Sequence, residues 1–316
     1  MTLRIGIVGA GAIGGFFAAH LGQAGAEIRL LARGATLAAL REKGVQLEHD
    51  GGRIHMEPTV VSDDPAQLGP VDILMITVKG QDTAAAIANL DPMIGPETRL
   101  LSLQNGLAGL EVMADTYGAD RVFSGITYVP AGVTEPGQVR HTGAVTRTLF
   151  GPYVAGAAHP NGPRLAELGA AAGLDMSYLE EPLPEIWAKF VMLAPFHIVC
   201  ALTRAPLGAW IDCSETREVY RAAMAEVAAL ARARGVDLPA DIVDRHLAFS
   251  VSQADRRTRA SMLDDLERGR ATELEATVGW LVREARRLSV PVPVHDMGYA
   301  LLKPLSAGRP PAGSAA

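Results

Sequence analysis

The sequence predicts an α/β N-terminal domain, with a parallel sheet and helices on both faces, followed by an all-α C-terminal domain. In the first half of the chain, short apolar runs rich in β-branched residues alternate with helical patterns. These runs are almost continuously apolar, as expected of strands that are buried on both faces of a parallel sheet. Beyond Pro182-Leu183-Pro184 the pattern is helical only, with long amphipathic segments.

The predicted elements follow one another closely along the chain. We expect strands at 3–8, 27–31, 72–78 and 99–103, and helices at 12–24, 36–43, 215–234 and 272–288. The segments 45–48 and 53–55 flank Asp50-Gly51-Gly52 and are predicted to form a hairpin. The segment 122–150, rich in threonine, valine, glycine and proline, is predicted to add more sheet.

The change of pattern near 181–184 marks a domain boundary. We therefore expect an N-terminal domain at 1–181 and a helical domain at 182–305. The last residues, 306–316, are mostly glycine, proline, alanine and serine, and we expect them to form a disordered tail.

Composition and charge narrow the range of functions. The net charge of -6 and the lack of any basic run argue against a nucleic-acid partner. Cys200 and Cys213 have no metal-ligand spacing around them, so we expect free thiols and no bound metal. The apolar stretch 186–202 contains a lysine and a proline and is predicted to be a buried core helix. With no signal-peptide layout at the N-terminus, we expect a cytoplasmic protein without a membrane partner.

The segment Gly9-Ala10-Gly11-Ala12-Ile13-Gly14 has the spacing G-x-G-x-x-G. It follows a predicted strand and opens a predicted helix, which is the context of the dinucleotide-binding loop in Rossmann-type domains. Gly9 would permit the tight turn, Gly11 the approach to the pyrophosphate and Gly14 the strand–helix packing. The helix N-terminus would present unpaired N–H groups to the phosphates. We predict that all six residues contact a dinucleotide.

The end of the second strand indicates which dinucleotide this is. NAD-binding domains usually carry Asp or Glu there, to bond the ribose 2′-hydroxyl. Here the strand ends in Leu30-Leu31-Ala32-Arg33-Gly34, without a carboxylate. Arg33 can instead bond a 2′-phosphate, which favours NADP. The alternative is that Arg33 is a solvated surface residue.

Lysine is rare in this chain, which has 25 arginines but four lysines. Lys79 follows a predicted buried strand, at the sheet edge where ligands bind in such folds. Lys189 stands alone among apolar residues on its predicted helix, where burial would lower its pKa and suit it to proton transfer. The alternatives are a surface charge for Lys79 and, for Lys189, a side chain that reaches out to solvent.

Four further polar residues are candidates for the site. Asn105, in Gln104-Asn105-Gly106, follows the strand 99–103 and is placed to bond a carbonyl or carboxamide, although periodicity alone does not exclude a plain Asn-Gly turn. Ser261 and Glu273 lie in or next to helices of the second domain, with Glu273 in the first turn of the helix that opens at Thr272. His197 lies on an apolar helix, where a lone histidine is more often a core residue than a ligand.

Taken together, these residues resemble the ketopantoate reductase family. The resemblance covers about residues 3–303 and rests on an ordered set of motifs: residues 9–14, Thr77-Val78-Lys79, Leu103-Gln104-Asn105-Gly106, Trp187-x-Lys189 and Ser261…Glu273. It implies a Rossmann domain followed by a helical domain, with the active site between them. It also implies an NADP-dependent oxidoreductase of pantothenate biosynthesis that acts on a keto acid, and a homodimer formed through the helical domain.

The resemblance assigns a role to each matching residue. It implies that Lys189 is the general acid on the keto oxygen and that Glu273 assists it and contacts the substrate hydroxyl. Ser261 would contact the substrate carboxylate. Lys79 and Asn105 would lie at the nicotinamide and carboxylate end of the cleft, touching both cofactor and substrate. Arg33 would meet the 2′-phosphate.

The presumed substrate pocket departs from the family's pattern. The family has asparagine four and eight residues after the catalytic lysine, where this chain has Leu193 and His197. A third asparagine aligns with Leu207. Because the family's asparagines bind the substrate's hydroxyl and carboxyl groups, we expect Leu193 and His197 to face a different keto acid or carbonyl compound, more apolar or differently shaped than ketopantoate. Ketopantoate itself stays open, as do a β-hydroxyacid or opine-type dehydrogenase and a non-catalytic NADP(H)-binding sensor.

Overall fold

The computed structural model describes residues 2–308, which divide into two compact units. The α/β unit comprises the residues up to Asn105 together with Gly109–Pro182. The helical unit comprises Gly106–Ala108 and the chain from Leu183 onward. The predicted domain limits, 1–181 and 182–305, stay predictions.

The α/β unit is built on an eight-stranded sheet with the strand order β12-β11-β8-β7-β6-β1-β2-β5. The strands are β1 (Arg4–Val8), β2 (Glu27–Leu31), β5 (Val60–Ser62), β6 (Val71–Ile76), β7 (Ile94–Ser102), β8 (Val122–Thr127), β11 (Thr148–Pro152) and β12 (Met176–Tyr178). Neighbours pair in parallel, except β8 and β11, which are antiparallel. The predicted, mostly parallel sheet is therefore confirmed.

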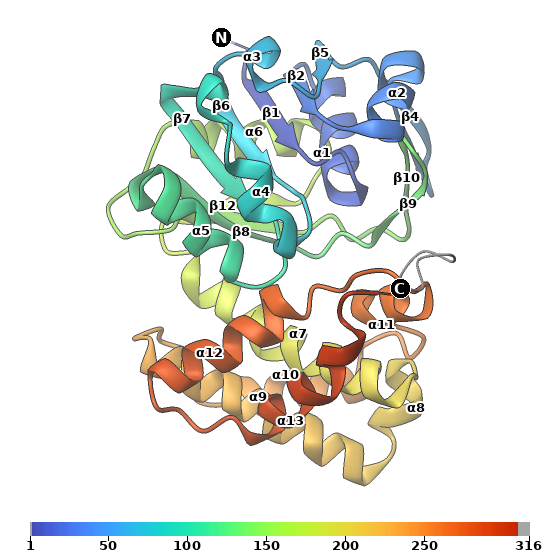
Figure 1. Ribbon diagram of the computed structural model, residues 1–316, viewed down its shortest axis with the longest axis vertical. Coiled ribbons are helices and arrows are strands. Elements are labelled where there is room, and N and C mark those ends of the chain that lie inside the picture. Colours follow the sequence, from blue (N-terminus) through green and yellow to red (C-terminus); the bar gives the residue numbers. More distant parts are fainter. Residues whose placement is uncertain (1, 309–316) are drawn as a thin grey trace, which may run out of the picture. The chain divides into compact units, whose positions relative to one another are not determined.

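Helices cover both faces of this sheet. They are α1 (Ala12–Gln23), α2 (Gly34–Lys43), α3 (Pro65–Leu68), α4 (Thr83–Ile87), α5 (Ala108–Tyr117) and α6 (Asn161–Ala171), with short 3₁₀ turns η1 (Gly80–Asp82), η2 (Asp91–Met93) and η3 (Ala119–Arg121). In the strand order, β2 lies next to β1 on one flank, and β6, β7 and β8 follow in turn on the other flank. Because parallel crossovers are right-handed, α1 lies on one face while α4 and α5 lie on the other (Figure 1).

A second, four-stranded sheet packs against α1. It has the order β4-β3-β10-β9, formed by β3 (Val45–His49), β4 (Gly52–Met56), β9 (Ala131–Glu135) and β10 (Gln138–His141). The predicted hairpin is confirmed as β3 and β4, which pair in antiparallel fashion. The sheet itself was not predicted, because β3 pairs in parallel with β10, a strand far along the sequence.

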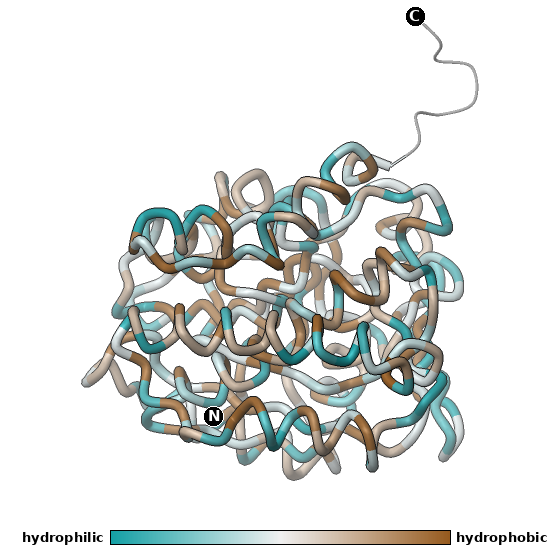
Figure 2. The backbone as a smooth tube through the Cα atoms, turned by 90° about the horizontal axis from the view of Figure 1, so that it is seen from below, coloured by the Kyte–Doolittle hydropathy of each residue, from teal (hydrophilic) through white to brown (hydrophobic). Residues whose placement is uncertain are grey.

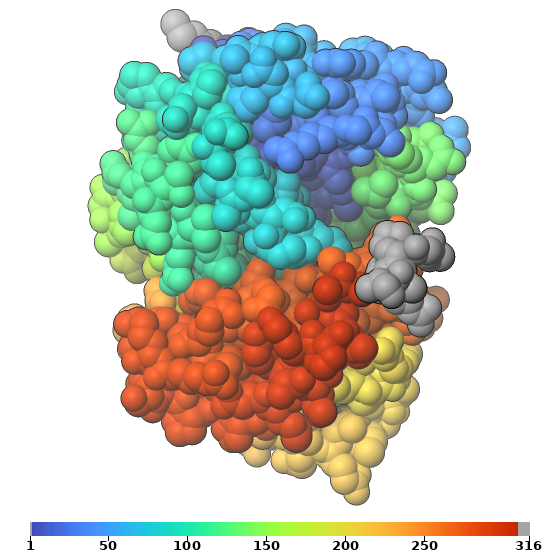
Figure 3. All heavy atoms as spheres, in the orientation of Figure 1, coloured from blue at the N-terminus to red at the C-terminus, as the bar shows by residue number. Residues whose placement is uncertain are grey.

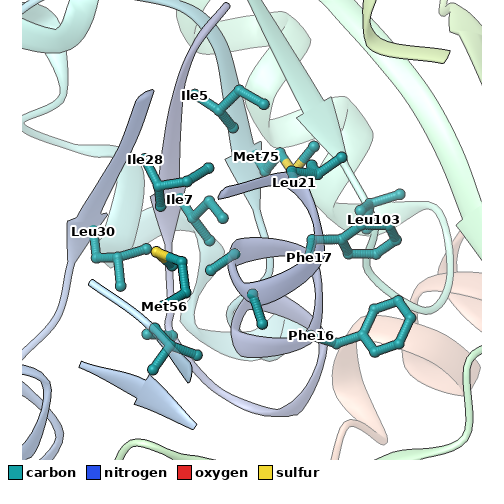
Figure 4. Packing of buried hydrophobic residues seen from close by; sticks show 14 of the residues in the cluster. Ile5, Ile7, Phe16, Phe17, Leu21, Ile28, Leu30, Met56, Met75 and Leu103 are labelled. Atoms are coloured by element: carbon teal, nitrogen blue, oxygen red, sulfur yellow. The ribbon is translucent and has the colours of Figure 1, made fainter. Parts of the chain in front are cut away.

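The core of this unit surrounds α1. Phe16, Phe17 and Leu21 of this helix are fully buried. Figure 4 shows them packed among apolar side chains of β1, β2, β4 and β6. Both sheets therefore contribute to one core, and the apolar face of α1 fixes the position of its N-terminus, where the glycine loop ends.

The second unit is helical, as the sequence predicts. It contains α7 (Leu183–Thr203), α8 (Leu207–Ile211), α9 (Ser214–Ala233), α10 (Ile242–Ser252), α11 (Ser261–Glu267), a π-helical turn η4 (Glu275–Gly279), α12 (Trp280–Arg287), α13 (Pro293–Leu302) and the 3₁₀ turn η5 (Lys303–Leu305). Hydrophilic and hydrophobic residues alternate along the helices in Figure 2, which is typical of amphipathic helices.

The central helix of this unit is α7. It is long and apolar enough to cross a membrane by length and composition, but 61% of its most apolar window is buried inside the protein. The helices α9, α11 and α13 pack against it. The predicted core helix is thus observed, and it carries Lys189, Leu193 and His197.

The described chain ends shortly after η5. The carbonyl oxygen of Ser306 accepts a hydrogen bond from the Thr272 N–H at 2.9 Å. Residues 309–316 of the predicted tail, 306–316, lie outside the described residues, and its disorder stays a prediction. Cys200 is buried, Cys213 is exposed, and neither forms a disulfide.

Candidate active site

The glycine loop between β1 and α1 forms a tight turn. Gly9 has a φ of +98°, a conformation that favours glycine, and its carbonyl oxygen accepts the Gly11 N–H at 2.8 Å. The Thr77 hydroxyl, just beyond β6, donates to the same oxygen at 2.7 Å. Thr77 therefore ties the loop to the neighbouring strand end, a role that the sequence did not reveal.

The two later glycines of the motif have different surroundings. A Cβ atom on Gly14 would lie 2.2 Å from the Gly9 carbonyl oxygen, so only glycine fits there. A Cβ atom on Gly11 would have nothing within 4 Å. Gly14 is therefore required by packing, whereas the bare backbone of Gly11 leaves open space where a phosphate can approach.

A pocket of about 380 Å³ lies beside this loop. Its lining residues come from four places in the α/β unit: the glycine loop with β1 (Val8, Gly9, Ala10, Gly11), the end of β2 with α2 (Leu31, Ala32, Arg33, Thr36), the segment after β6 (Val78, Asp82, Ala85, Ala86) and the second sheet (Val133, Gly137). Figure 3 shows the hollow, where N-terminal atoms in dark blue are recessed between lighter blue, cyan and green surfaces.

The predicted cofactor residues divide into three groups. Gly9, Ala10, Gly11 and Arg33 line this pocket. Ala12, Ile13 and Gly14 belong to the first turn of α1 and do not line it. Lys79 and Asn105 also lie outside it.

Lys79 and Asn105 follow adjacent strands. Lys79 comes shortly after β6 and Asn105 shortly after β7, and these two strands pair up to Ile76 and Ser102. The buried side chain of Gln104 joins the two loops, because its amide nitrogen donates to the Val78 carbonyl oxygen at 2.8 Å. The structure thus brings Lys79 and Asn105 to the same sheet edge, where ligands bind in open α/β folds.

In the helical unit, an aromatic cluster fixes the surroundings of Lys189. Trp187 and Phe190 of α7 each lie about 6 Å, ring centre to ring centre, from Trp280 at the start of α12. All three rings are buried. The cluster holds the beginning of α12, and with it the segment that follows Glu273, against the turn of α7 that carries Lys189.

Lys189 and Glu273 interact electrostatically. Burial lowers the pKa of Lys189 to about 8, and the negative charge of Glu273 opposes this effect. A lysine with this pKa holds its proton at neutral pH and gives it up more readily than an exposed lysine. The pair is therefore suited to protonate an oxygen on which negative charge develops.

The sequence suggested that Glu273 lies in the first turn of a helix, but in the structure it precedes the helical segment. The helical segment begins at Glu275 and is a π-turn, in which the Gly279 N–H donates to the Leu274 carbonyl oxygen at 2.8 Å. The Thr277 hydroxyl and N–H both donate to the carbonyl oxygen of Glu273, at 2.8 and 3.0 Å. These bonds fix the backbone of Glu273, and π-turns are frequent at functional sites.

The loop after Asn105 packs against this same turn. Gly106 belongs to the helical unit and has a φ of +84°. A Cβ atom there would lie 3.1 Å from the Ala276 carbonyl oxygen and 3.3 Å from the Thr277 methyl carbon. The Asn-Gly pair is thus more than a plain turn, because the glycine allows a close approach to the segment that follows Glu273.

Leu193 and His197 follow Lys189 at one and two helical turns on α7. His197 is 2% exposed, and its Nδ1 atom is buried without a hydrogen-bond partner among the described residues. Burial and the charge of Lys189 lower the pKa of His197 to about 4, so its ring is neutral at neutral pH. The structure therefore places a neutral imidazole with an unused ring nitrogen within the electrostatic reach of Lys189.

Leu207 and Ser261 complete the set of predicted residues. Leu207 is buried and opens α8. Ser261 is exposed at the start of α11, a helix that packs against α7. The Ser261 hydroxyl bonds no other described residue, so it is open to solvent or to a ligand.

Comparison with known proteins identifies the family. Residues 5–155 match the model for "Ketopantoate reductase PanE/ApbA" and residues 183–306 match "Ketopantoate reductase PanE/ApbA C terminal". A 2-dehydropantoate 2-reductase of Mesorhizobium japonicum is 31% identical over 334 residues, covering 97% of this chain and 99% of the relative. The structure of 2-dehydropantoate 2-reductase from Geobacter metallireducens superposes with a TM-score of 0.87 at 28% identity, covering 96% of this chain and 99% of that one.

A further solved structure shares the fold at lower identity. It is the ternary structure of D-mandelate dehydrogenase with NADH and anilino(oxo)acetate, with a TM-score of 0.87, 20% identity, and coverage of 96% of this chain and 98% of that one. The two family models together span most of the chain, and each of its units resembles its counterpart in these relatives. The chain belongs to the ketopantoate reductase family of oxidoreductases, which reduce keto acids.

Proposed function

We propose that this enzyme uses NADPH to reduce a small 2-keto acid to the 2-hydroxy acid, with Lys189 as the general acid and Glu273 as its partner. The observation that carries the proposal is the charge-coupled pair itself, in which both side chains are partly buried. Lysines are seldom drawn out of solvent beside one carboxylate on an apolar helix for structural reasons alone, and perturbed pKa values cluster at functional sites.

In this proposal the cofactor and each side chain have separate roles. A bound nicotinamide would supply the hydride to the keto carbon. As negative charge develops on the keto oxygen, the Lys189 ammonium stabilises it and donates the proton. Glu273 keeps Lys189 protonated despite its burial. Lys79, Asn105 and Ser261 orient the substrate, because each offers a polar group at a strand end or a helix start.

The preference for NADPH rests on the end of β2. Arg33 lines the pocket and is exposed, and Thr36 from the first turn of α2 lines it as well. A guanidinium, a hydroxyl and a helix N-terminus are the groups that bind a phosphate in proteins. None of the pocket residues contributed by β2 and α2 carries a carboxylate to bond a ribose 2′-hydroxyl.

We further propose that the substrate has an apolar, branched or aromatic side and that His197 bonds its polar end. Leu193 and Leu207 replace two amides of the family's pattern with apolar side chains. The unused Nδ1 atom of buried His197 is the polar group that they leave. An unpaired buried polar atom costs about 1–3 kcal/mol, which a ligand hydrogen bond would recover.

A matched pair of substrates tests this assignment. Ketopantoate and 3,3-dimethyl-2-oxobutanoate differ by one hydroxyl, and benzoylformate offers an aromatic side instead. NADPH oxidation should be measured with all three, for the wild type and for His197→Leu. A preference for ketopantoate that His197→Leu abolishes would assign the hydroxyl to His197. Good turnover of benzoylformate alone would assign an aromatic acid, and no turnover of any 2-keto acid would overturn the proposed function.

The cellular setting follows the family's pattern. We expect a cytoplasmic enzyme, and a homodimer formed through the helical domain. Met297 and Leu301, one turn apart on α13, are 54% and 56% exposed and offer an apolar contact surface. Sedimentation of the wild type and of the double variant Met297→Asp, Leu301→Asp tests this surface: a dimer that becomes a folded monomer supports it, and an unchanged dimer places the interface elsewhere.

A further inference from the structure

Two parts of the dinucleotide pocket wall lie outside the glycine motif and Arg33 and have no part of the ligand assigned to them. Ala85 and Ala86 of α4 form a wall of small apolar side chains. The second sheet contributes Val133 of β9, which is 51% exposed although it is apolar. Small side chains on one wall and an exposed aliphatic side chain on another suit a flat ring, because such a ring would cover the apolar surface that water now contacts.

The position of this apolar slot follows from the other groups in the pocket. The pyrophosphate belongs beside Gly9 and Gly11, and the ribose 2′-phosphate beside Arg33. The part of the pocket between α4 and β9 then remains for the base. This step rests on the proposed function, namely that the pocket binds NADP(H).

One polar side chain, Asp82, stands beside this slot. Of the described residues that line the pocket, Asp82 is the one with a carboxylate. Aspartate at the N-cap of a helix normally accepts a hydrogen bond from the first turn, but Asp82, at the N-cap of α4, makes no such bond. Its carboxylate bonds no other described residue either. It is therefore available to a ligand.

We propose that Asp82 recognises the adenine base, by accepting a hydrogen bond from its exocyclic amino group while Val133 and the α4 alanines pack on the ring. The end of β2, where a carboxylate would bond the ribose, carries Arg33 instead. Asp82 comes from the opposite side of the pocket, after β6, so a contact with the base is favoured over a contact with the ribose. A carboxylate accepts only, and it therefore selects a base that donates at this position.

The reduced hypoxanthine analogue of NADPH tests the proposal, because its base has a carbonyl oxygen in place of the amino group. Binding of both dinucleotides to the full-length protein can be followed by nicotinamide fluorescence. We expect the wild type to bind NADPH more tightly than the analogue by about tenfold to a hundredfold, the effect of a hydrogen bond to a charged group. In Asp82→Asn the ratio should fall to about one, because an amide can accept from the amine or donate to the carbonyl.

Two controls separate base recognition from other effects. Asp63→Asn removes an equal charge from an exposed position outside the pocket, and it should keep the wild-type ratio. Val133→Ala should weaken both dinucleotides equally, because packing on the ring does not depend on the substituent.

The contrary outcomes are distinct. Equal affinity of the wild type for NADPH and the analogue would overturn the role of Asp82 and leave the proposed function intact. An Asp82→Ala variant that changes the ratio of NADPH to NADH affinity, but not the ratio of NADPH to the analogue, would place Asp82 at the ribose. No binding of NADPH by the wild type would contradict the proposed function itself.

Discussion

The carboxylate of Glu273 and the ammonium of Lys189 lie close enough that the charge of Glu273 counters the effect of burial on the lysine. Burial still dominates and lowers the pKa of Lys189 to about 8. The lysine is thus mostly protonated at neutral pH, as a general acid for carbonyl reduction must be. Its protonation falls off within the range where activity can be measured.

The pH dependence of reduction should report this pKa. Since Lys189 must carry its proton, kcat/KM should decline as the pH rises through about 8. Glu273→Gln removes the charge that raises the lysine pKa, so the decline should move to lower pH. Steady-state rates across pH 6–10 check both statements. A decline unmoved in Glu273→Gln would show that another group limits the reaction.

Two substitutions of Lys189 separate its charge from its proton. Lys189→Ala should lower kcat by roughly 10²–10⁴-fold, the usual effect of losing a general acid. Lys189→Arg keeps a positive charge but cannot give up a proton, so it should rescue little of this loss. Single-turnover reduction, with NADPH affinity measured alongside, checks the prediction. A near-wild-type rate in Lys189→Ala would refute the role.

The glycine loop offers variants that separate folding from binding. Gly14→Ala places its Cβ atom 2.2 Å from the Gly9 carbonyl oxygen and should strongly destabilise the α/β unit. Gly11→Ala meets nothing within 4 Å and should leave the melting temperature nearly unchanged, while the methyl group obstructs the pyrophosphate. Thermal unfolding and NADPH titration of both variants check this. Normal NADPH affinity in a folded Gly11→Ala would place the phosphates elsewhere.

Arg33→Ala should weaken NADPH binding and leave NADH binding nearly unchanged, because only NADPH carries the 2′-phosphate. Arg41 is an exposed arginine of the same helix region that does not line the pocket, so Arg41→Ala controls for the loss of one positive charge. Titration of each protein with both cofactors gives the comparison. An equal loss of affinity for both dinucleotides would remove Arg33 from the 2′-phosphate.

Local sequence patterns predicted the elements that local forces decide. The strand expected at 27–31 is β2, with the same limits, and the helix expected at 215–234 is α9, shifted by one residue. In both, the periodicity of apolar residues matches the burial of a single element. Such patterns do not depend on distant partners, which is why they can be recognised from the sequence.

Long-range pairing left no such signal. The strands β3 and β10 pair in parallel at Gln46 and Gln138, and nothing in either segment specifies the other. The second sheet was therefore not predicted, and neither were Val133 and Gly137 as pocket residues. The π-turn before α12 was missed for a related reason, because one extra residue in a helical turn hardly changes the apolar periodicity.

The candidate site was predicted unevenly. The motifs identified the residues at strand ends, and the scarcity of lysine indicated Lys189. In the structure the charge of Glu273 acts on the pKa of this lysine. The supporting hydrogen bonds of Thr77 and Gln104 were not foreseen, since each joins loops from different strands. The catalytic and binding roles stay predictions until the variants are measured.

The burial of His197 should make the unfolding free energy depend on pH. Its pKa is about 4 in the folded protein, against an ordinary value of 6.5, so below pH 6.5 the unfolded chain binds a proton that the folded protein excludes. Stability should therefore fall as the pH drops from about 6.5 to 4, by up to about 3 kcal/mol from this residue. Other histidines whose pKa is lowered by partial burial, such as His20 and His246, add their own dependence. The test is thus the difference between the wild type and His197→Asn in urea unfolding at several pH values. This difference in unfolding free energy should change steeply below pH 6.5 and be constant above pH 7. A constant difference throughout would mean that folding does not lower the pKa of His197, because a water or an ion already bonds its ring.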